Sequence, residues 1–170
     1  LLTLTQNNSG GTQYGGGLLS KFPMSYGFYE ARVQFGSTWP AWWISSMRVG
    51  NDPIPQDPAV SGTEMDIAES RAWANPLQIS HSVHWNGYGS GHQSQEVSPG
   101  KADDGNWHTF GFWWTGSSYR FYIDGNLTWT FTAAISHGAG EYMLLNNAYW
   151  VGGNSTGVAR WDYVRYWTSG

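Results

Sequence analysis

The sequence has no cysteine, few charged side chains and no long run of apolar residues. Without cysteine there is no disulfide framework and no thiolate metal site. Only 12% of the residues are charged, and 8 Lys and Arg against 12 Asp and Glu give a net charge of −4. No basic patch is then available to neutralise the phosphates of a nucleic acid, so we expect no nucleic-acid partner. Because no apolar run approaches the ~20 residues of a membrane span, we expect no membrane partner either.

The start of the chain shows no signal peptide, although the lack of cysteine is compatible with a secreted, extracellular protein. Leu1-Leu2-Thr3-Leu4 already has the pattern of a strand, so we expect a segment upstream of Leu1 to be missing. We expect residues 1–170 to form a single domain, because this length is enough to bury a core of its own. We also expect that domain to be a monomer.

Aromatic residues and glycine are abundant: there are 12 Trp, 10 Tyr, 7 Phe and 23 Gly. Few charges and many Trp and Tyr side chains are typical of a carbohydrate-binding surface, because aromatic rings stack on the apolar faces of sugars. The alternative is that most of these rings fill the core of a sheet structure, in which aromatic residues pack well. Composition alone leaves both interpretations open.

Short alternating runs, separated by clusters of Gly, Asn, Asp, Ser and Pro, predict β-strands along the whole chain. Asp124-Gly125 between two of these runs predicts a tight hairpin. We expect loops at 48–63 and 86–106 and a flexible turn at Gly15-Gly16-Gly17. Many short strands in one domain predict an all-β sandwich or jelly roll. The clearest strands are predicted at Leu18–Phe22, Gly27–Phe35, Ala41–Met47, Glu64–Ala68, Ile79–His84, Trp107–Thr115, Tyr119–Ile123, Leu127–Thr132, Tyr142–Asn147 and Ala159–Trp167.

Three carboxylate side chains lie within six residues of the stretch Gly62–Ser70. On a strand, Glu64 and Asp66 share one face, the apolar residues between them point into the core, and strict alternation would bury Glu69. A lone buried carboxylate is costly, so we predict a β-bulge between Asp66 and Glu69 that returns all three acids to one face. Such a set of carboxyls suits glycoside hydrolysis. The alternative, a solvated polar face, has to explain three like charges crowded together at a cost in stability.

Two other predicted strands offer candidate sugar contacts. Glu30 and Arg32 share a face, where they could form an ordinary surface ion pair or hydrogen-bond sugar hydroxyls on a concave sheet. Trp39 and Trp43 share one face of their strand, and Trp42 lies on the other. Alternation does not say which of these two faces is inside.

Three histidines, His81, His84 and His92, are close together in the sequence. His81 and His84 fall on opposite faces of a strand, and we find no third ligand for a zinc site. We therefore expect one histidine to form a hydrogen bond near the acids rather than to bind a metal. The Gly-x-Ser-x-Gly elbow, a phosphate-binding glycine loop and His-Glu-x-x-His are absent from the sequence.

As a set, these residues resemble glycoside hydrolase family 16. The segment Glu64-Met-Asp66-Ile-Ala-Glu69 is similar to the bulged form of that family's signature, Glu-x-Asp-x-x-Glu, which is typical of laminarinases, agarases and carrageenases. Further similar segments follow one another along the chain at Ser20-Lys21, Tyr26–Val33, Trp39–Trp43, Trp107–Phe110, Tyr122–Gly125 and Asp162–Tyr166.

The resemblance implies a concave antiparallel β-jelly roll, a concanavalin-like sandwich, with a cleft across one sheet. It implies retaining, endo-acting hydrolysis of a β-linked polysaccharide, for which we expect a β-1,3-linked glucan of the laminarin type and no catalytic cofactor. By position, Glu64 is the nucleophile, Asp66 the assisting acid and Glu69 the acid/base. Some members bind a distal structural calcium, in which Asp162 could take part. The candidate substrate contacts are Trp39, Trp43, Glu30, Arg32, His84 and Asn146.

Departures from the laminarinase pattern bear on the choice of glycan. Ser70-Arg71-Ala72-Trp73 follows the last acid where laminarinases usually have an apolar or aromatic residue and a glycine, and the segment 146–153 also differs. The loop 85–92 favours a galactan-type specificity, so an endo-β-galactosidase of the same family is one alternative. A non-catalytic carbohydrate-binding module on the same scaffold is another, because fold does not fix function. The three acids, which a lectin does not need, argue against the module.

Overall fold

The structure, a computed structural model, describes residues 1–9, 12–36, 38–46, 62–71, 78–100, 103–135, 137, 141–148 and 156–168. This part of the chain contains β-strands and no helix, hence none with the length and apolarity needed to cross a membrane. The strands are β1 (Leu2–Ser9), β2 (Thr12–Tyr14), β3 (Gly16–Leu19), β4 (Gly27–Gln34), β5 (Trp39–Ser45), β6 (Glu64–Arg71), β7 (Gln78–Trp85), β8 (Gln93–Gly100), β9 (Trp107–Trp114), β10 (Ser118–Ile123), β11 (Asn126–Thr132), β12 (Tyr142–Ala148) and β13 (Gly157–Thr168).

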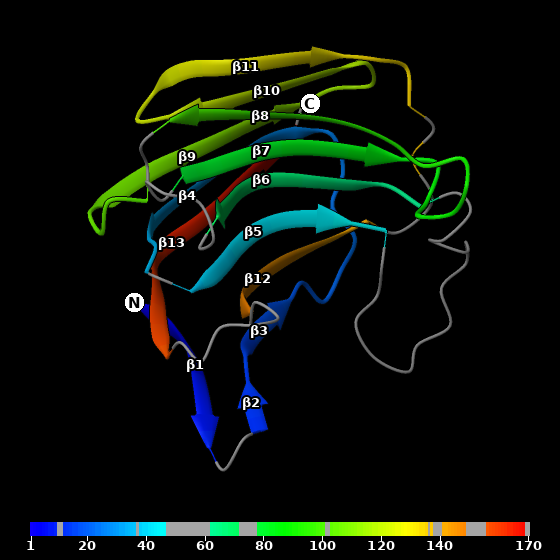
Figure 1. Ribbon diagram of the computed structural model, residues 1–170. Helices are drawn as coiled ribbons and strands as arrows, with labels where there is room; N and C mark the ends of the chain where they lie inside the picture. The colour runs from blue at the N-terminus through cyan, green and yellow to red at the C-terminus, as the bar shows by residue number, and fades with distance from the viewer. Residues whose placement is uncertain are drawn as a thin grey trace.

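The strands form two antiparallel sheets. One sheet has seven strands in the order β11-β10-β9-β4-β13-β1-β2, and the other has six in the order β3-β12-β5-β6-β7-β8. Figure 1 shows the six-stranded sheet in front, with β13 of the seven-stranded sheet passing behind β6 and β7. The expected all-β sandwich of jelly-roll type is confirmed.

The core lies between the two sheets, because one face of each sheet is apolar. Tyr29, Ala31 and Val33 alternate along β4 and are fully buried. Trp42 of β5 and Met65 of β6 are fully buried in the same cluster. The intervening residues of each strand therefore point away from the core, onto the outer face of their own sheet.

The alternating pattern misses strands that bury few apolar side chains. β8 lies within the predicted loop 86–106, and all its residues are exposed except the partly buried Val97 and Gly100. β3 includes Gly16 and Gly17, where we expected a turn, and it ends at Leu19 rather than at Phe22. The predicted loop 48–63 lies outside the described residues except for its last two. The hairpin at Asp124-Gly125 is confirmed, since it joins β10 to β11 with φ angles of 50° and 76°.

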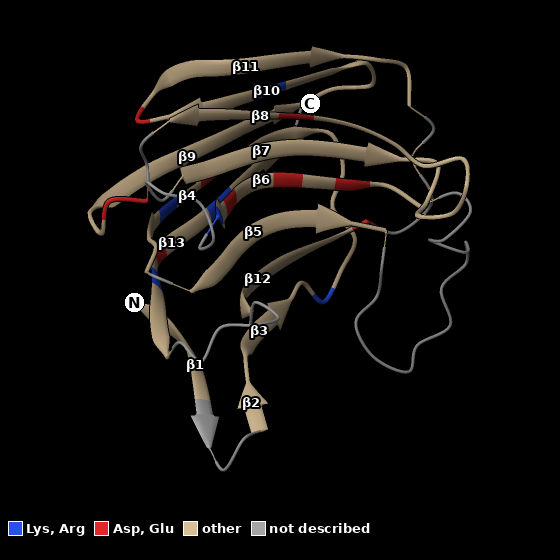
Figure 2. Cartoon of the chain, in the orientation of Figure 1, with Lys and Arg blue, Asp and Glu red and all other residues tan. Residues whose placement is uncertain are grey.

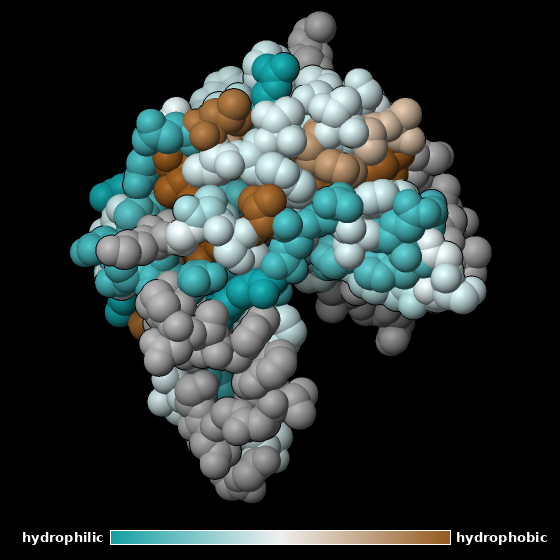
Figure 3. All heavy atoms as spheres, turned by 45° about the horizontal axis from the view of Figure 1, so that its top comes forward, coloured by the Kyte–Doolittle hydropathy of each residue, from teal (hydrophilic) through white to brown (hydrophobic). Residues whose placement is uncertain are grey.

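Figure 3 shows one face of the molecule with its hydrophobic residues in several separate groups between more hydrophilic ones. Most of the aliphatic and aromatic residues that alternate along the strands are instead in the buried cluster between the sheets. This distribution is what a two-layer sandwich requires.

Candidate active site

The three acids lie on β6, near the middle of the six-stranded sheet, and Figure 2 shows acidic positions spaced along this strand. Asp66 pairs with Ser82 of β7 and Glu69 with Ser80, so two residues of β6 stand opposite one residue of β7. The two residues between the acids, Ile67 and Ala68, are both fully buried. The predicted β-bulge is therefore confirmed, and it brings Glu69 to the same face as Asp66.

His81 stands opposite the bulge on β7 and supports it from the core side. It is fully buried, and its Nδ1 lies 2.6 Å from the carbonyl oxygen of Ile67. Burial lowers the pKa of His81 to about 4, so its ring is neutral near neutral pH and Nδ1–H donates to this carbonyl. The imidazole also stacks on Phe121 with ring centroids 4.9 Å apart. His81 thus lies on the face opposite His84, as alternation predicted.

The acids open into a cleft of about 230 Å³ on the outer face of the six-stranded sheet. Trp39 and Trp43 of β5 are partly exposed there, whereas Trp42 between them is fully buried. This settles the question that alternation leaves open, because the set that includes Trp39 and Trp43 faces the cleft. The residues that line it are Trp39, Ala41, Trp43, Glu64, Asp66, Glu69, Asn146 and Ala148.

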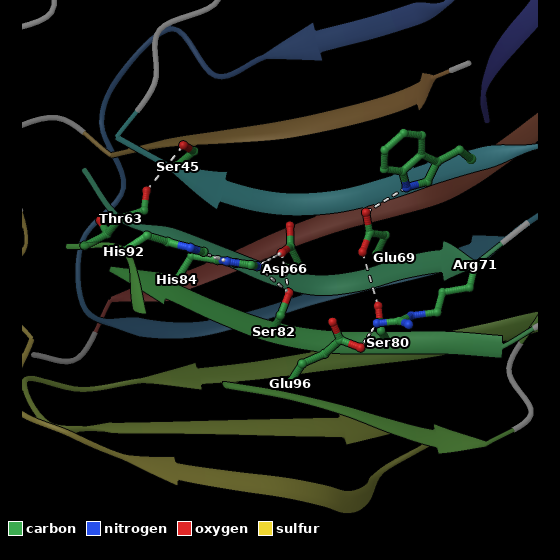
Figure 4. Close-up of polar contacts among 11 residues, drawn as sticks. Ser45, Thr63, Asp66, Glu69, Arg71, Ser80, Ser82, His84, His92 and Glu96 are labelled. Carbon is green, nitrogen blue, oxygen red and sulfur yellow. Dashed lines mark hydrogen bonds and ion pairs between the residues drawn. The ribbon is translucent and has the colours of Figure 1, made fainter. Parts of the chain in front are cut away.

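Both carboxylate oxygens of Glu69 accept hydrogen bonds. The Nε1–H of Trp39 donates to Oε1 over 2.7 Å, and the hydroxyl of Ser80 donates to Oε2 over 3.2 Å. Figure 4 shows Ser80 beside Glu69, and the two partners come from the strands on either side of β6. The carboxylate is therefore held in place from both sides while remaining partly exposed to the cleft.

Asp66 is more enclosed than Glu69, with 5% of its surface exposed. Its Oδ2 accepts a hydrogen bond from the hydroxyl of Ser82 and lies 3.5 Å from His84 Nε2. The same His84 nitrogen is 3.2 Å from the Ser82 hydroxyl. Figure 4 shows Ser82 and His84 converging on Asp66 from β7. One histidine near the acids, as expected from the sequence, is therefore His84.

Glu64 and Asp66 hydrogen-bond to each other, and both bind protons more tightly than free carboxyls do. Burial, reinforced by the charge of Asp66, raises the pKa of Glu64 to about 8. Burial, reinforced by the charge of Glu69, also raises the pKa of Asp66. Because the two groups interact strongly, they titrate as a unit, and near neutral pH the pair holds a proton.

The segment after β7 supplies two residues that the sequence argument did not single out for the site. Asn86 and Gly87 have φ angles of 62° and 68°, and this tight turn brings Tyr88 back over β6. The hydroxyl of Tyr88 hydrogen-bonds to Glu64, while the residue as a whole remains 46% exposed. His92 stacks on His84 with centroids 5.2 Å apart and a hydrogen bond of 3.0 Å. An aromatic residue between glycines just after a site strand is the only sequence signal for Tyr88.

Four of the six candidate substrate contacts lie at this site. Trp39, Trp43 and Asn146 line the cleft, and His84 is beside Asp66. The indole Nε1–H of Trp43 donates to Asn146 Oδ1 over 2.5 Å, which ties β5 to β12 at the cleft wall. The structure shows where these side chains lie; their contact with a substrate stays a prediction.

The other two candidate contacts, Glu30 and Arg32, are not among the residues that line the cleft, and their contact with a substrate also stays a prediction. Both are on β4, in the other sheet, and point away from the core. Glu30 accepts a hydrogen bond from the Tyr163 hydroxyl over 2.9 Å, and Arg32 forms a 2.9 Å ion pair with Asp162. Alternation correctly places both on an outward face, but it does not say which of the two sheets that face belongs to.

The described residues contain one group of three side chains able to hold a metal ion, namely Glu64, Asp66 and His84, with ligand atoms within 4.8 Å of one another. These are residues of the acid site itself. Asp162 belongs to no such group in the described part of the chain, and its carboxylate accepts the hydrogen bond of Arg32. This environment does not favour calcium at Asp162, and a calcium site there stays a prediction.

Comparison with known proteins gives a consistent result. The model of the family described as glycosyl hydrolases family 16 matches residues 1–165. A curated relative, endo-1,3-1,4-beta-glycanase ExsH of Rhizobium meliloti (strain 1021), is 32% identical over 120 residues. The match covers 67% of this chain but only 23% of that protein, so the chain corresponds to about a quarter of the relative's length.

Solved structures share the fold at low sequence identity. A glycoside hydrolase family 16 endo-glucanase from Bacteroides ovatus superimposes with a TM-score of 0.75 at 22% identity, over 97% of this chain and 80% of that one. LamA from Zobellia galactanivorans, in complex with laminaritriose and laminaritetraose, superimposes with a TM-score of 0.70 at 23% identity, over 96% of this chain and 77% of that one. Porphyranase B from the same organism superimposes with a TM-score of 0.70 at 20% identity, over 98% of this chain and 75% of that one.

Proposed function

The chain belongs to glycosyl hydrolases family 16, and on that premise we propose that it is a retaining endo-β-glycanase. Its proposed substrate is a β-1,3-linked glucan of the laminarin type, cut at internal bonds outside the cell. The observation that carries the proposal is the bulge in β6, because it brings three carboxyls to one face of a cleft walled by two indoles. A strand that served only as scaffold would have no reason to accept that crowding.

In the first proposed step, the carboxylate of Glu64 attacks the anomeric carbon and the bond from that carbon to the leaving oxygen breaks. Glu69 gives its proton to the leaving oxygen, so a covalent glycosyl–enzyme forms and one half of the glycan departs. Because Trp39 can only donate, it keeps Oε1 of Glu69 as an acceptor, whereas the Ser80 hydroxyl can donate or accept. Oε2 is therefore the oxygen that can carry the proton.

In the second proposed step, Glu69, now a carboxylate, takes a proton from a water molecule that attacks the anomeric carbon. The bond to Glu64 breaks, and the product leaves with its original anomeric configuration. Retention by this route requires the Glu64 and Glu69 carboxyls to be about 5–5.5 Å apart.

Asp66 is assigned the proton of the Glu64–Asp66 pair during attack. Glu64 has to be ionised to act as nucleophile, yet burial raises its pKa to about 8 in the free protein. If the shared proton lies on Asp66, then Asp66 donates a hydrogen bond to the Glu64 carboxylate and holds its orientation. The hydroxyls of Ser82 and Tyr88 support this pair from either side.

A neutral glucan suits the lining of the cleft. Among the residues that the structure describes, the lining combines two indoles with an amide and three acids and contains no Lys or Arg that could neutralise a sulfate or a uronate. Two of the similar proteins have names or ligands that refer to 1,3-1,4-beta-glycan and to laminari-oligosaccharides, which supports a glucan, whereas the name of porphyranase B does not.

The test is reducing-end release from laminarin, mixed-linkage glucan, agarose, carrageenan and galactans, with the anomer first formed read by NMR. We expect laminarin to be cut fastest and the β-anomer to appear first. Faster release from a galactan would show that the substrate is a galactan and not a glucan. An α-anomer as the first product would exclude a retaining mechanism. Binding without release from any of these glycans would overturn the enzyme in favour of a carbohydrate-binding module.

A further inference from the structure

The outer face of the seven-stranded sheet carries a row of three large aromatic side chains. Trp167 of β13 pairs with Phe28 of β4, which in turn pairs with Trp113 of β9. We call these three residues the outer aromatic row. Trp167 is 47% exposed and Trp113 41% exposed, and the rings of Phe28 and Trp167 are 5.8 Å apart. Neither tryptophan belongs to the buried cluster between the sheets, and the guanidinium of Arg120 lies 4.8 Å from the ring centroid of Trp113.

A pocket of about 270 Å³ lies beside the row on the same face. Its floor is Gly111, where a Cβ would be 3.1 Å from the ring tip of Phe28 and 3.3 Å from Cβ of Tyr122. Glycine at this position therefore lets both aromatic side chains lie close to the strand. The carboxylate of Glu30 and the hydroxyl of Thr109 provide the polar part of the lining.

This combination fits a neutral sugar better than other ligands. Sugar rings have apolar faces that stack on aromatic side chains and hydroxyls that bond to carboxylates and to other hydroxyls. An anionic ligand would meet the carboxylate of Glu30 in the pocket. A wholly apolar partner would remove water from that carboxylate and offer it no hydrogen bond beyond the one from Tyr163.

We propose that the outer aromatic row and its pocket bind a neutral glycan chain at a site separate from the cleft. The row crosses three neighbouring strands spaced about 4.8 Å apart, so it runs across the sheet as an extended chain of sugars could. The acids are on the other sheet, and the core lies between the two faces. A polysaccharide held on this face stays near the enzyme without occupying the cleft, which benefits long or insoluble substrates and leaves short ones unaffected.

The choice of β-1,3-glucan as the glycan rests on the proposed function. The test measures binding to insoluble β-1,3-glucan. It compares the double variant Trp113→Ala/Trp167→Ala with the parent, and both proteins carry Glu64→Gln so that the glucan is not hydrolysed. We expect the dissociation constant to rise about tenfold with the two rings removed. In the active background, the same two substitutions should leave kcat/KM on soluble laminarihexaose unchanged and slow the hydrolysis of the insoluble polymer.

Phe22→Ala is the matched control, because Phe22 is 64% exposed and lines neither the cleft nor the outer pocket. Binding that is unchanged in the double variant, or that falls equally in the control, overturns the inference. Thermal unfolding checks the fold, and the single variant Trp167→Ala, near the end of the last strand, repeats the test with the least disturbance. A parent that forms a dimer which the double variant loses would identify the row as a self-contact and overturn the proposal.

The two proposals fail in different ways. If the parent hydrolyses laminarin and the double variant binds the polymer as the parent does, the outer site is wrong and the enzyme stands. If the protein hydrolyses no glycan but binds the insoluble glucan through the row, the outer site stands and the enzyme is wrong.

Discussion

Trp39 donates its indole hydrogen to Glu69 over 2.7 Å, so a cleft wall and a proposed catalytic acid are directly joined. Trp39→Phe keeps an aromatic ring but removes this donor. Because a hydrogen bond to a charged group contributes about 1.5–3 kcal/mol, we expect kcat on laminarin to fall at least about tenfold. Trp43→Phe is the control, since the Trp43 indole donates to the amide of Asn146 and not to an acid. An equal loss of kcat in both variants would assign the effect to ring packing instead.

The roles of Glu64 and Glu69 separate under substitution. Glu64→Ala should abolish hydrolysis, and azide should then restore cleavage with inverted product, because a small anion can occupy the vacated space. Glu69→Ala should slow laminarin hydrolysis by about 10²–10⁴-fold and spare substrates with good leaving groups, which need no acid. Product anomers measured by NMR decide the assignment. Azide rescue with inversion in Glu69→Ala would reverse the two roles.

The bulge could be predicted from the sequence because regular alternation would bury the carboxylate of Glu69 in the core, and one extra residue in the strand avoids this. The side on which Trp39 and Trp43 lie could not be predicted, because both faces of this strand carry aromatic residues and alternation does not say which face is buried. It was resolved by the full burial of Trp42. The sheet that carries Glu30 could not be predicted either, because a strand pattern fixes a face but not the sheet to which the strand belongs.

Elements without apolar alternation could not be predicted at all. β8 is an edge strand whose residues are nearly all exposed, so it has no buried face to detect. Tyr88 reaches Glu64 only because Asn86 and Gly87 turn the chain sharply, and that return depends on tertiary structure. Apolar alternation in the sequence therefore predicts the strands that bury a face in the core, and it does not predict exposed edge strands or side chains that are placed by turns.

The raised pKa of Glu64 predicts a pH-dependent stability. The folded protein holds this proton up to a pKa of about 8, against 4.5 for a free glutamate, so folding favours the protonated form. That contribution is complete below about pH 4.5 and is lost as pH rises toward 8. Glu64→Gln cannot ionise, and we expect it to be more stable than the parent by about 4 kcal/mol at pH 8 and by less than about 1 kcal/mol at pH 5.

Urea unfolding of both proteins at the two pH values measures this difference. Asp162→Asn is the control, because it neutralises an exposed carboxylate far from the cleft. A parent and a Glu64→Gln variant that lose stability in parallel between the two pH values would show that Glu64 does not hold the proton.

Tyr88→Phe removes one hydroxyl from the Glu64 carboxyl and leaves the aromatic ring. Burial and the nearby Glu64 charge raise the pKa of Tyr88, so its hydroxyl stays protonated and can donate. We expect kcat to fall about tenfold with little change in KM, because the lost bond orients a reacting group. Steady-state kinetics on laminarin measure both constants. A rise in KM alone would instead make Tyr88 a substrate contact.

Trp42 and Trp43 are adjacent in β5 and should respond to alanine in opposite ways. Trp42 is fully buried between the sheets, so Trp42→Ala should destabilise the fold by about 3–5 kcal/mol. Trp43 is partly exposed at the cleft, so Trp43→Ala should change stability far less. It should raise KM for laminarin several-fold, because a ring that stacks on a sugar contributes about 1 kcal/mol to binding. Chemical unfolding and oligosaccharide binding to each variant separate the two effects. If Trp43→Ala destabilised the protein as much as Trp42→Ala while binding glycan normally, Trp43 would be part of the core and the cleft wall would need another sugar contact.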